Sequence, residues 1–273
     1  MSLPVPSTQE GREGLAAVLA GPERALVGLD FDGTLSPIVP VPDQARAHPA
    51  IPPVLQRLAD LGVHIAVVTG RPAATAVDYG GLAGVRGLTV LGHYGLERWR
   101  DGRVTAPGEV AGVDAARRQL PSLLAELGAP DGTYVEDKGR AVAVHTRRAA
   151  DPQAAFDLLR APLSRLADET GLVVEPGRLV LELRPAGGDK GDAVRALVEE
   201  LTPSAVVFAG DDLGDLPAFA EVQRLRSTGL PGLLVCSGSS EVTALAERAD
   251  LVVDGPEGVV ELLTSLADAI TAG

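Results

Sequence analysis

The stretch Ala25-Leu26-Val27-Gly28-Leu29-Asp30-Phe31-Asp32-Gly33-Thr34-Leu35-Ser36 decides the fold of this chain. An apolar run typical of a buried parallel strand ends on the carboxylates of Asp30 and Asp32. Ligands bind at the carboxyl ends of strands in an open α/β sheet, so both carboxylates are expected in a crevice. Two like charges this close require a divalent metal or a shared proton. An Asx turn is the alternative for Asp-x-Asp alone.

The residues around this stretch indicate a parallel sheet. Val54 to Leu61 has apolar residues at helical spacing, and Val63 to Val68 is a second apolar run. A strand, a helix and a strand in this order form a right-handed crossover, so the sheet is predicted to be parallel. Residues 1–14 are rich in Pro and Gly and are expected to be loose, with a short helix over Leu15 to Leu19.

Three further polar motifs follow predicted strands or begin predicted helices. Thr69-Gly70-Arg71 ends the second strand, where a hydroxyl and backbone amides predict an anion cradle. Lys190 begins a helix after two glycines, where the helix dipole and the ammonium favour phosphate. The segment Asp211-Asp212-Leu213-Gly214-Asp215 follows the apolar run 205–209, and its carboxylate oxygens are the ligands that Mg²⁺ prefers.

The middle of the chain has a different pattern, which predicts an inserted α+β domain. Two segments read as long helices, and each is followed by a hairpin, one around Lys138-Gly139 and one around Pro176-Gly177. We expect this αββαββ insert over residues 108–185, with residues 1–107 and 186–273 forming the parallel-sheet core. An insert at this place is expected to act as a lid.

Composition limits the partners and the compartment. The net charge of −13 argues against nucleic acid and anionic membranes, so an anionic small molecule needs a local positive site. The single cysteine, Cys236, excludes a disulfide framework. No signal peptide and no run of about 18 apolar residues is present, so a soluble, cytoplasmic protein is expected. The sequence does not determine the oligomeric state, and a monomer is compatible with it.

The strand-end motifs carry a resemblance to a known superfamily. Asp30-Phe31-Asp32-Gly33-Thr34-Leu35 resembles the first motif of the haloacid-dehalogenase-like phosphatases, and the segments at Thr69, Lys190 and Asp211 resemble the other three. The resemblance implies a Rossmann-like α/β core with a cap. It also implies that Asp30 is the nucleophile and Asp32 the acid/base, and that Thr69 and Lys190 bind the phosphoryl group.

The same resemblance implies a Mg²⁺ site. Its ligands would be Asp30, the backbone carbonyl of Asp32 and Asp211, with Asp212 or Asp215 as water-mediated or outer partners. The family usually has Thr where Gly214 stands, which leaves that contribution open. His93 stands one place before the position where family members carry a His, so we assign it no role and expect it at the surface.

The insert resembles a narrower family. Val135-Glu136-Asp137-Lys138-Gly139, Ala143-Val144-His145 and Leu181-Glu182-Leu183-Arg184-Pro185 are similar to insert signatures of trehalose-6-phosphate phosphatases. This resemblance implies that the sugar is contacted by Glu136, Lys138 and Glu182, with Arg178 and Arg184 as further candidates. Arg71 fits the Ser/Thr-Gly-Arg form of sugar phosphatases and is expected to bind substrate.

These observations predict Mg²⁺-dependent hydrolysis of trehalose 6-phosphate through an aspartyl-phosphate intermediate. Two alternatives stay open. One is a related phosphatase acting on sucrose phosphate or mannosylglycerate phosphate, because the core motifs say little about the sugar. The other is a phospho-accepting signalling module, because receiver domains also place strand-end carboxylates near Mg²⁺ and a lysine. The inserted domain and the second carboxylate, Asp32, argue against such a module.

Overall fold

The computed structural model describes residues 3–106, 108, 111–238 and 243–273. The chain forms two compact units, residues 1–106 with 188–273, and residues 107–187. The expected domain boundary lies between residues 107 and 108. Residues 107, 109 and 110, next to this boundary, are outside the described residues. The second unit interrupts the first in sequence, and each is described by itself.

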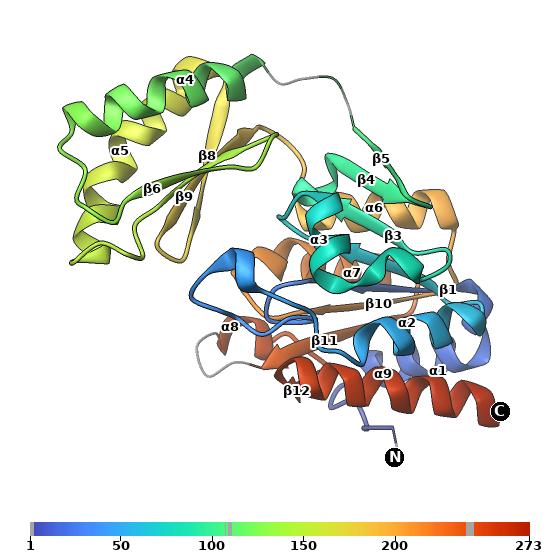
Figure 1. The fold of residues 1–273 in the computed structure, drawn as a ribbon. Coiled ribbons are helices and arrows are strands. Elements are labelled where there is room, and N and C mark those ends of the chain that lie inside the picture. The colour runs from blue at the N-terminus through green and yellow to red at the C-terminus, as the bar shows by residue number, and fades with distance from the viewer. Residues whose placement is uncertain (1–2, 107, 109–110, 239–242) are drawn as a thin grey trace. The chain divides into compact units, whose positions relative to one another are not determined.

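The first unit is built around an eight-stranded sheet in the order β12-β11-β10-β1-β2-β3-β4-β5 (Figure 1). The strands are β1 (Ala25–Leu29), β2 (His64–Val68), β3 (Thr89–Gly92), β4 (Glu97–Arg100), β5 (Arg103–Thr105), β10 (Ala205–Gly210), β11 (Gly232–Gly238) and β12 (Leu251–Asp254). The strands from β12 to β3 in this order pair in parallel. The predicted α/β fold with a parallel core sheet is therefore confirmed.

Helices cover both faces of this sheet. They are α1 (Gln9–Ala20), α2 (Ile51–Asp60), α3 (Ala73–Gly80), α6 (Lys190–Leu201), α7 (Leu216–Ser227), α8 (Thr243–Ala246) and α9 (Gly255–Ala272). In β1, Val27 and Leu29 join the hydrophobic core under α1, α2, α3 and α9, whereas Leu26 joins the core under α6, α7 and α8. Successive side chains of a strand point to opposite faces, so an apolar run such as β1 is buried on both.

The sheet differs from the sequence prediction at one edge. There, β4 pairs antiparallel with both of its neighbours, β3 and β5. The Asp101-Gly102 pair joins β4 to β5, and both residues have positive φ, 49° and 78°. A two-residue Asp-Gly loop of this kind matches the twist of a hairpin, so the signal was present in the sequence and was missed. His93, expected at the surface, lies next to this hairpin and is 2% exposed.

The N-terminal segment also differs from the prediction, because α1 begins at Gln9 and not at Leu15. The Thr8 side chain accepts a hydrogen bond from the Gly11 amide and caps the helix. A Cβ atom at Gly14 would lie 1.9 Å from the carbonyl oxygen of Gly232 in β11, so this glycine lets the helix pack directly on the strand. Packing on β11 therefore extends a helix that local composition does not favour.

The second unit has the αββαββ order. Its elements are α4 (Ala111–Glu126), β6 (Tyr134–Asp137), β7 (Val142–His145), α5 (Pro152–Thr170), β8 (Leu172–Gly177) and β9 (Val180–Pro185). The strands form an antiparallel sheet in the order β6-β7-β9-β8. Both helices pack on one face through a core that includes Leu120, Val144, Leu163 and Leu181. The opposite face of this sheet is not covered by the helices of the unit.

Candidate active site

The site in the first unit begins at the carboxyl ends of two neighbouring strands. β1 pairs in parallel with β10, and Leu29 lies opposite Ala209. Asp30 follows β1, and its amide donates a hydrogen bond to the Ala209 carbonyl at 2.9 Å. Asp211 follows β10. The parallel register therefore brings the two carboxylates to the same edge of the sheet.

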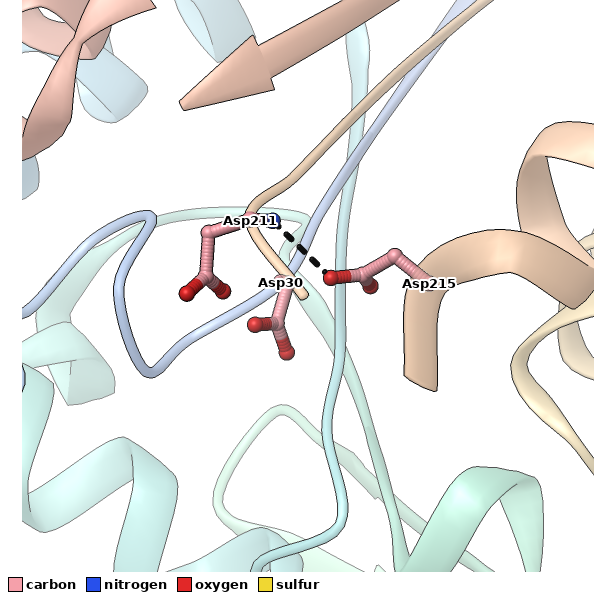
Figure 2. Close-up of side chains that lie close together, drawn as sticks. All are labelled: Asp30, Asp211 and Asp215. Carbon is pink, nitrogen blue, oxygen red and sulfur yellow. Dashed lines mark hydrogen bonds between the residues drawn. The ribbon is translucent and has the colours of Figure 1, made fainter. Parts of the chain in front are cut away.

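Three buried carboxylates meet at this edge, those of Asp30, Asp211 and Asp215 (Figure 2). One oxygen from each lies within 4.8 Å of the others. Asp215 Oδ2 accepts hydrogen bonds from the Asp211 amide at 3.0 Å and the Asp212 amide at 3.2 Å. Gly33 has φ 80°, and a Cβ atom there would lie 2.0 Å from Asp211 Oδ2. Only glycine allows the loop after β1 to adopt this backbone so close to the Asp211 carboxylate.

A buried lysine provides positive charge to the cluster. Lys190 is the first residue of α6, whose N-terminus is closed by a capping box between Asp189 and Asp192. Its Nζ lies 2.6 Å from Asp30 Oδ1 and 2.7 Å from Asp215 Oδ1. The ammonium therefore connects two of the three carboxylates, and the cluster retains an excess of negative charge.

Burial and mutual repulsion control protonation in this cluster. Burial raises the pKa of Asp211 to about 8, and the charge of Asp215 adds to the rise. Burial likewise raises the pKa of Asp30 well above its ordinary value, although Lys190 opposes the rise. Burial works to lower the pKa of Lys190, but attraction to Asp215 and Asp30 prevails and raises it well above its ordinary value. The lysine is thus firmly cationic, while a carboxyl of the cluster binds a proton easily.

The chemistry of the cluster fits a hard divalent cation. Its donors are carboxylate oxygens, as Mg²⁺ prefers. Asp211 Oδ1 is buried and has no hydrogen-bond partner among the described residues, which is costly unless a cation or a proton balances it. Three buried carboxylates with one lysine among them have the charge excess that a divalent ion would neutralise. The group of Asp30, Asp211 and Asp215 can therefore hold a metal ion.

Asp32 lies in a different environment from Asp30, although the two are only two residues apart. Its carboxylate forms a bidentate pair with Arg71, from Nε to Oδ2 and from Nη2 to Oδ1, both at 2.7 Å. Arg71 Nη2 also donates to the Pro42 carbonyl at 3.0 Å. Thr69 is buried, and its Oγ1 accepts a hydrogen bond from the Arg71 amide at 3.2 Å. Asp32 is thus paired with the Arg71 side chain, whereas Thr69 contacts the Arg71 backbone.

The Asp212 side chain is exposed and lies outside the group of three carboxylates. It accepts a hydrogen bond from the Gly214 amide at 2.9 Å and caps the 3-10 helix Leu213–Asp215. The structure therefore brings Asp211 and Asp215 to Asp30, and it leaves the side chains of Asp32 and Asp212 in other contacts. The spacing of these residues in the sequence did not indicate which of Asp212 and Asp215 lies beside Asp30.

The second unit has a row of glutamates on the sheet face away from its helices. Glu136 pairs with Ala143, Ala143 with Glu182, and Glu182 with Glu175, so the row crosses all four strands. Residues directly opposite each other share a face. The neighbours Val142, Val144, Leu181 and Leu183 belong to the helix-covered core, so the row faces the other way. We call Glu136, Ala143, Glu182 and Glu175 the glutamate row.

Each glutamate of the row has a basic partner. Lys138 pairs with Glu182, Arg184 Nη2 lies 3.0 Å from Glu175 Oε2, and His145 Nε2 lies 2.7 Å from Glu136 Oε2. Glu182 is 5% exposed, and its Oε1 is buried and accepts no hydrogen bond from the part of the chain that the structure describes. This oxygen is therefore an acceptor whose hydrogen-bonding capacity is not satisfied by those residues.

Two members of this arrangement, Glu175 and His145, were not assigned a role from the sequence. Side chains alternate along a strand, so His145 and Glu175 are expected on the face opposite to their apolar neighbours Val144 and Val174. The register that aligns them is visible only in the paired strands. Arg178, a further candidate, is exposed in the turn between β8 and β9.

None of the helices in the described part of the chain combines the length and the apolar character that crossing a membrane requires.

Comparison with known proteins agrees with the motifs and the geometry. The family model described as trehalose-phosphatase matches residues 28–253. A probable trehalose-phosphate phosphatase of Sinorhizobium fredii is 33% identical over 221 residues, which cover 79% of this chain and 80% of the relative. An uncharacterized glycosyl hydrolase of Mycobacterium tuberculosis is 37% identical over 96% of this chain, which spans 20% of that protein.

Among solved structures, the C-terminal domain of the C. albicans trehalose-6-phosphate phosphatase has a TM-score of 0.74. The match covers 98% of this chain and 99% of that one at 21% identity, so it supports the fold. The family model and the Sinorhizobium relative support the family directly. The chain therefore belongs to the trehalose-phosphatase family of haloacid-dehalogenase-like hydrolases.

Proposed function

We propose that this protein hydrolyses trehalose 6-phosphate to trehalose and phosphate through an aspartyl-phosphate on Asp30. The family supports the reaction class. One observation carries the mechanism: Asp30, Asp211 and Asp215 meet at neighbouring strand ends, with Lys190 bound to two of them. A nucleophile, a cation site and a fixed positive charge at one place are what a phosphoryl transfer requires.

In the first half-reaction, an Asp30 carboxylate oxygen attacks phosphorus, and the bond between phosphorus and the sugar oxygen breaks. Asp32 donates a proton to the leaving oxygen. In the second half-reaction, Asp32 accepts a proton from water as the water oxygen attacks phosphorus. The bond between phosphorus and the Asp30 oxygen then breaks and releases phosphate, which restores the Asp30 carboxylate and leaves Asp32 protonated for the next cycle.

Asp30, Asp211 and Asp215 would hold Mg²⁺, with the backbone carbonyl of Asp32 and the side chain of Asp212 as outer candidates. When bound, Mg²⁺ reduces the repulsion between the phosphate dianion and the carboxylates. Lys190 orients Asp30 and balances charge on the phosphoryl oxygens. Thr69 follows β2 beside β1, and we assign its hydroxyl to a phosphoryl oxygen.

Arg71 was expected to contact substrate, and the bidentate pair with Asp32 suggests a more specific role. The two hydrogen bonds at 2.7 Å hold the Asp32 carboxylate in one orientation. We therefore propose that Arg71 acts on the substrate chiefly by orienting Asp32. Asp32 must leave part of this pair when it transfers a proton.

We assign sugar recognition to the glutamate row and its partners Lys138 and Arg184. Carboxylates accept hydrogen bonds from sugar hydroxyls, and an ammonium donates to them. The strongest single support for this assignment is the buried Glu182 Oε1, which accepts no hydrogen bond from any residue that the structure describes. A site that pairs each hydroxyl rejects sugars that leave these groups unpaired.

The test is phosphate release from a panel of trehalose 6-phosphate, sucrose 6-phosphate, mannosylglycerate phosphate and glucose 6-phosphate, with Mg²⁺ and with chelator. We expect trehalose 6-phosphate to have the highest kcat/KM and chelator to abolish release. Equal rates on all four would overturn the substrate assignment. A stable phosphoaspartate without turnover would favour a signalling module instead.

The natural partner under this proposal is a small sugar phosphate, and nucleic acid and membrane partners are not expected. The cytoplasmic location expected from the single cysteine belongs to the same proposal; Cys236 is buried in the first unit.

A further inference from the structure

The strongest observation left outside the proposed mechanism concerns His145 on β7. Its side chain is 7% exposed, and Nε2 lies 2.7 Å from Glu136 Oε2. An ionised carboxylate can only accept a hydrogen bond, so Nε2 must carry the proton in this contact. His145 therefore donates to Glu136.

The His145 ring is itself held in place. Tyr134 lies directly opposite it across the β6–β7 pair. The two rings are stacked, with centroids 4.5 Å apart and an interplanar angle of 5°. The guanidinium of Arg148 lies 4.7 Å from the centre of the Tyr134 ring. A stacked, nearly buried imidazole has few other orientations, so its Nε2 proton points in a defined direction.

Glu136 needs such a constraint more than Glu182 does. It lies on β6, an edge strand of the sheet, and 28% of its side chain is exposed. Glu182 lies on an inner strand and is 5% exposed. Ordering a partly exposed glutamate side chain on ligand binding costs conformational entropy, and a hydrogen bond that exists before binding reduces this cost.

We propose that His145 is a positioning residue that fixes the Glu136 carboxylate for one hydroxyl of the sugar, and thereby contributes to sugar selectivity. This inference rests on the proposed function for the assignment of Glu136 to the sugar. The inference goes beyond that function because His145 donates its hydrogen bond to Glu136 and is assigned no contact with the substrate. Pre-organisation of this kind acts on substrate binding more than on the chemical step.

The test compares His145→Gln, His145→Phe and the wild type. Gln keeps an N–H donor without the ring, whereas Phe keeps a ring for Tyr134 without the donor. For His145→Phe we expect kcat/KM on the sugar phosphate to fall about tenfold, mainly through KM, because a hydrogen bond to a charged group is lost. We expect His145→Gln to recover most of the loss. The loss on p-nitrophenyl phosphate, which has no sugar, should be several-fold smaller.

Leu158→Ala is the matched control in the same unit, because Leu158 is 45% exposed on α5. Its kinetics should match the wild type, and thermal melts of all variants identify any that fail to fold. Equal losses on both substrates, or wild-type selectivity in His145→Phe, would overturn the inference.

A second measurement does not depend on turnover. Long-range ¹⁵N–¹H correlation spectra of the wild-type protein report which imidazole nitrogen of His145 carries the proton. A proton on Nε2 supports the inference, and a neutral ring with the proton on Nδ1 alone overturns it. Failure of the wild type on trehalose 6-phosphate would instead count against the proposed function, and the variants would then be compared on the best sugar phosphate of the panel.

Discussion

The carboxylate cluster of the first unit and the glutamate row of the second unit balance their charges in different ways. In the cluster, Asp30 and Asp215 share Lys190, and Asp211 Oδ1 is buried and accepts no hydrogen bond from the described residues. In the row, each glutamate contacts a basic side chain.

This difference has a chemical consequence. A buried cluster with excess negative charge favours a divalent cation, and then a dianionic phosphate, over neutral ligands. In the row, each carboxylate already contacts a basic side chain, so it has less need of a metal ion and suits neutral hydroxyls, which accept and donate hydrogen bonds. We therefore expect substitutions in the cluster to change how activity depends on Mg²⁺, and substitutions in the row to change how activity depends on the sugar.

The largest expected effect is in the cluster. Asp30→Asn should lower kcat by at least about 10⁴-fold, because the amide cannot act as the nucleophile. The measurement is steady-state phosphate release with Mg²⁺ present. Asp78→Asn is the matched control, because Asp78 has the same charge and is exposed on α3. A loss as large in Asp78→Asn as in Asp30→Asn would contradict the assignment of Asp30 as the nucleophile.

An intermediate effect is expected in the row. Glu182→Gln keeps the shape of the side chain but removes the negative charge that pairs with the Lys138 ammonium. We expect kcat/KM on the sugar phosphate to fall about ten- to hundredfold, mostly through KM. The Mg²⁺ concentration that gives half-maximal activity should stay the same. A shift in that concentration would show that the two acidic regions do not act separately.

The smallest effect, counted per pH unit, is expected on the stability of the metal-free protein. The pKa of Asp211 is raised by burial to about 8 from an ordinary 3.8, so the folded metal-free protein binds more protons than the unfolded chain between these values. This contribution to stability is full below the unfolded pKa and is lost as the pH rises through the folded pKa. The free energy of unfolding should fall by on the order of 1 kcal/mol per pH unit in this window.

Urea unfolding of the metal-free protein at pH 5, 6, 7 and 8 measures this slope, and Asp211→Asn should flatten it. Because the cation takes the place of the proton, Mg²⁺ should stabilise the protein most at pH 8. A Mg²⁺ effect that is equal at pH 5 and pH 8 would argue against the cluster as the metal site.

Much of the architecture was predictable from the sequence because it depends on local patterns. Apolar runs that end on carboxylates marked β1 and β10, and turn residues marked the two hairpins of the insert. The predicted α/β fold and the family were confirmed. The β4–β5 hairpin was missed although its Asp-Gly turn was readable, whereas the early start of α1 depends on packing against β11.

The sequence by itself determined which residues follow each strand, because side-chain periodicity and turn chemistry act over a few neighbours. Only the tertiary structure decided the partners: Asp215 and not Asp212 joins Asp30, Arg71 holds Asp32, and His145 holds Glu136. These contacts depend on strand register and on side-chain orientation across distant segments. Neither of these properties is encoded within a short window of sequence.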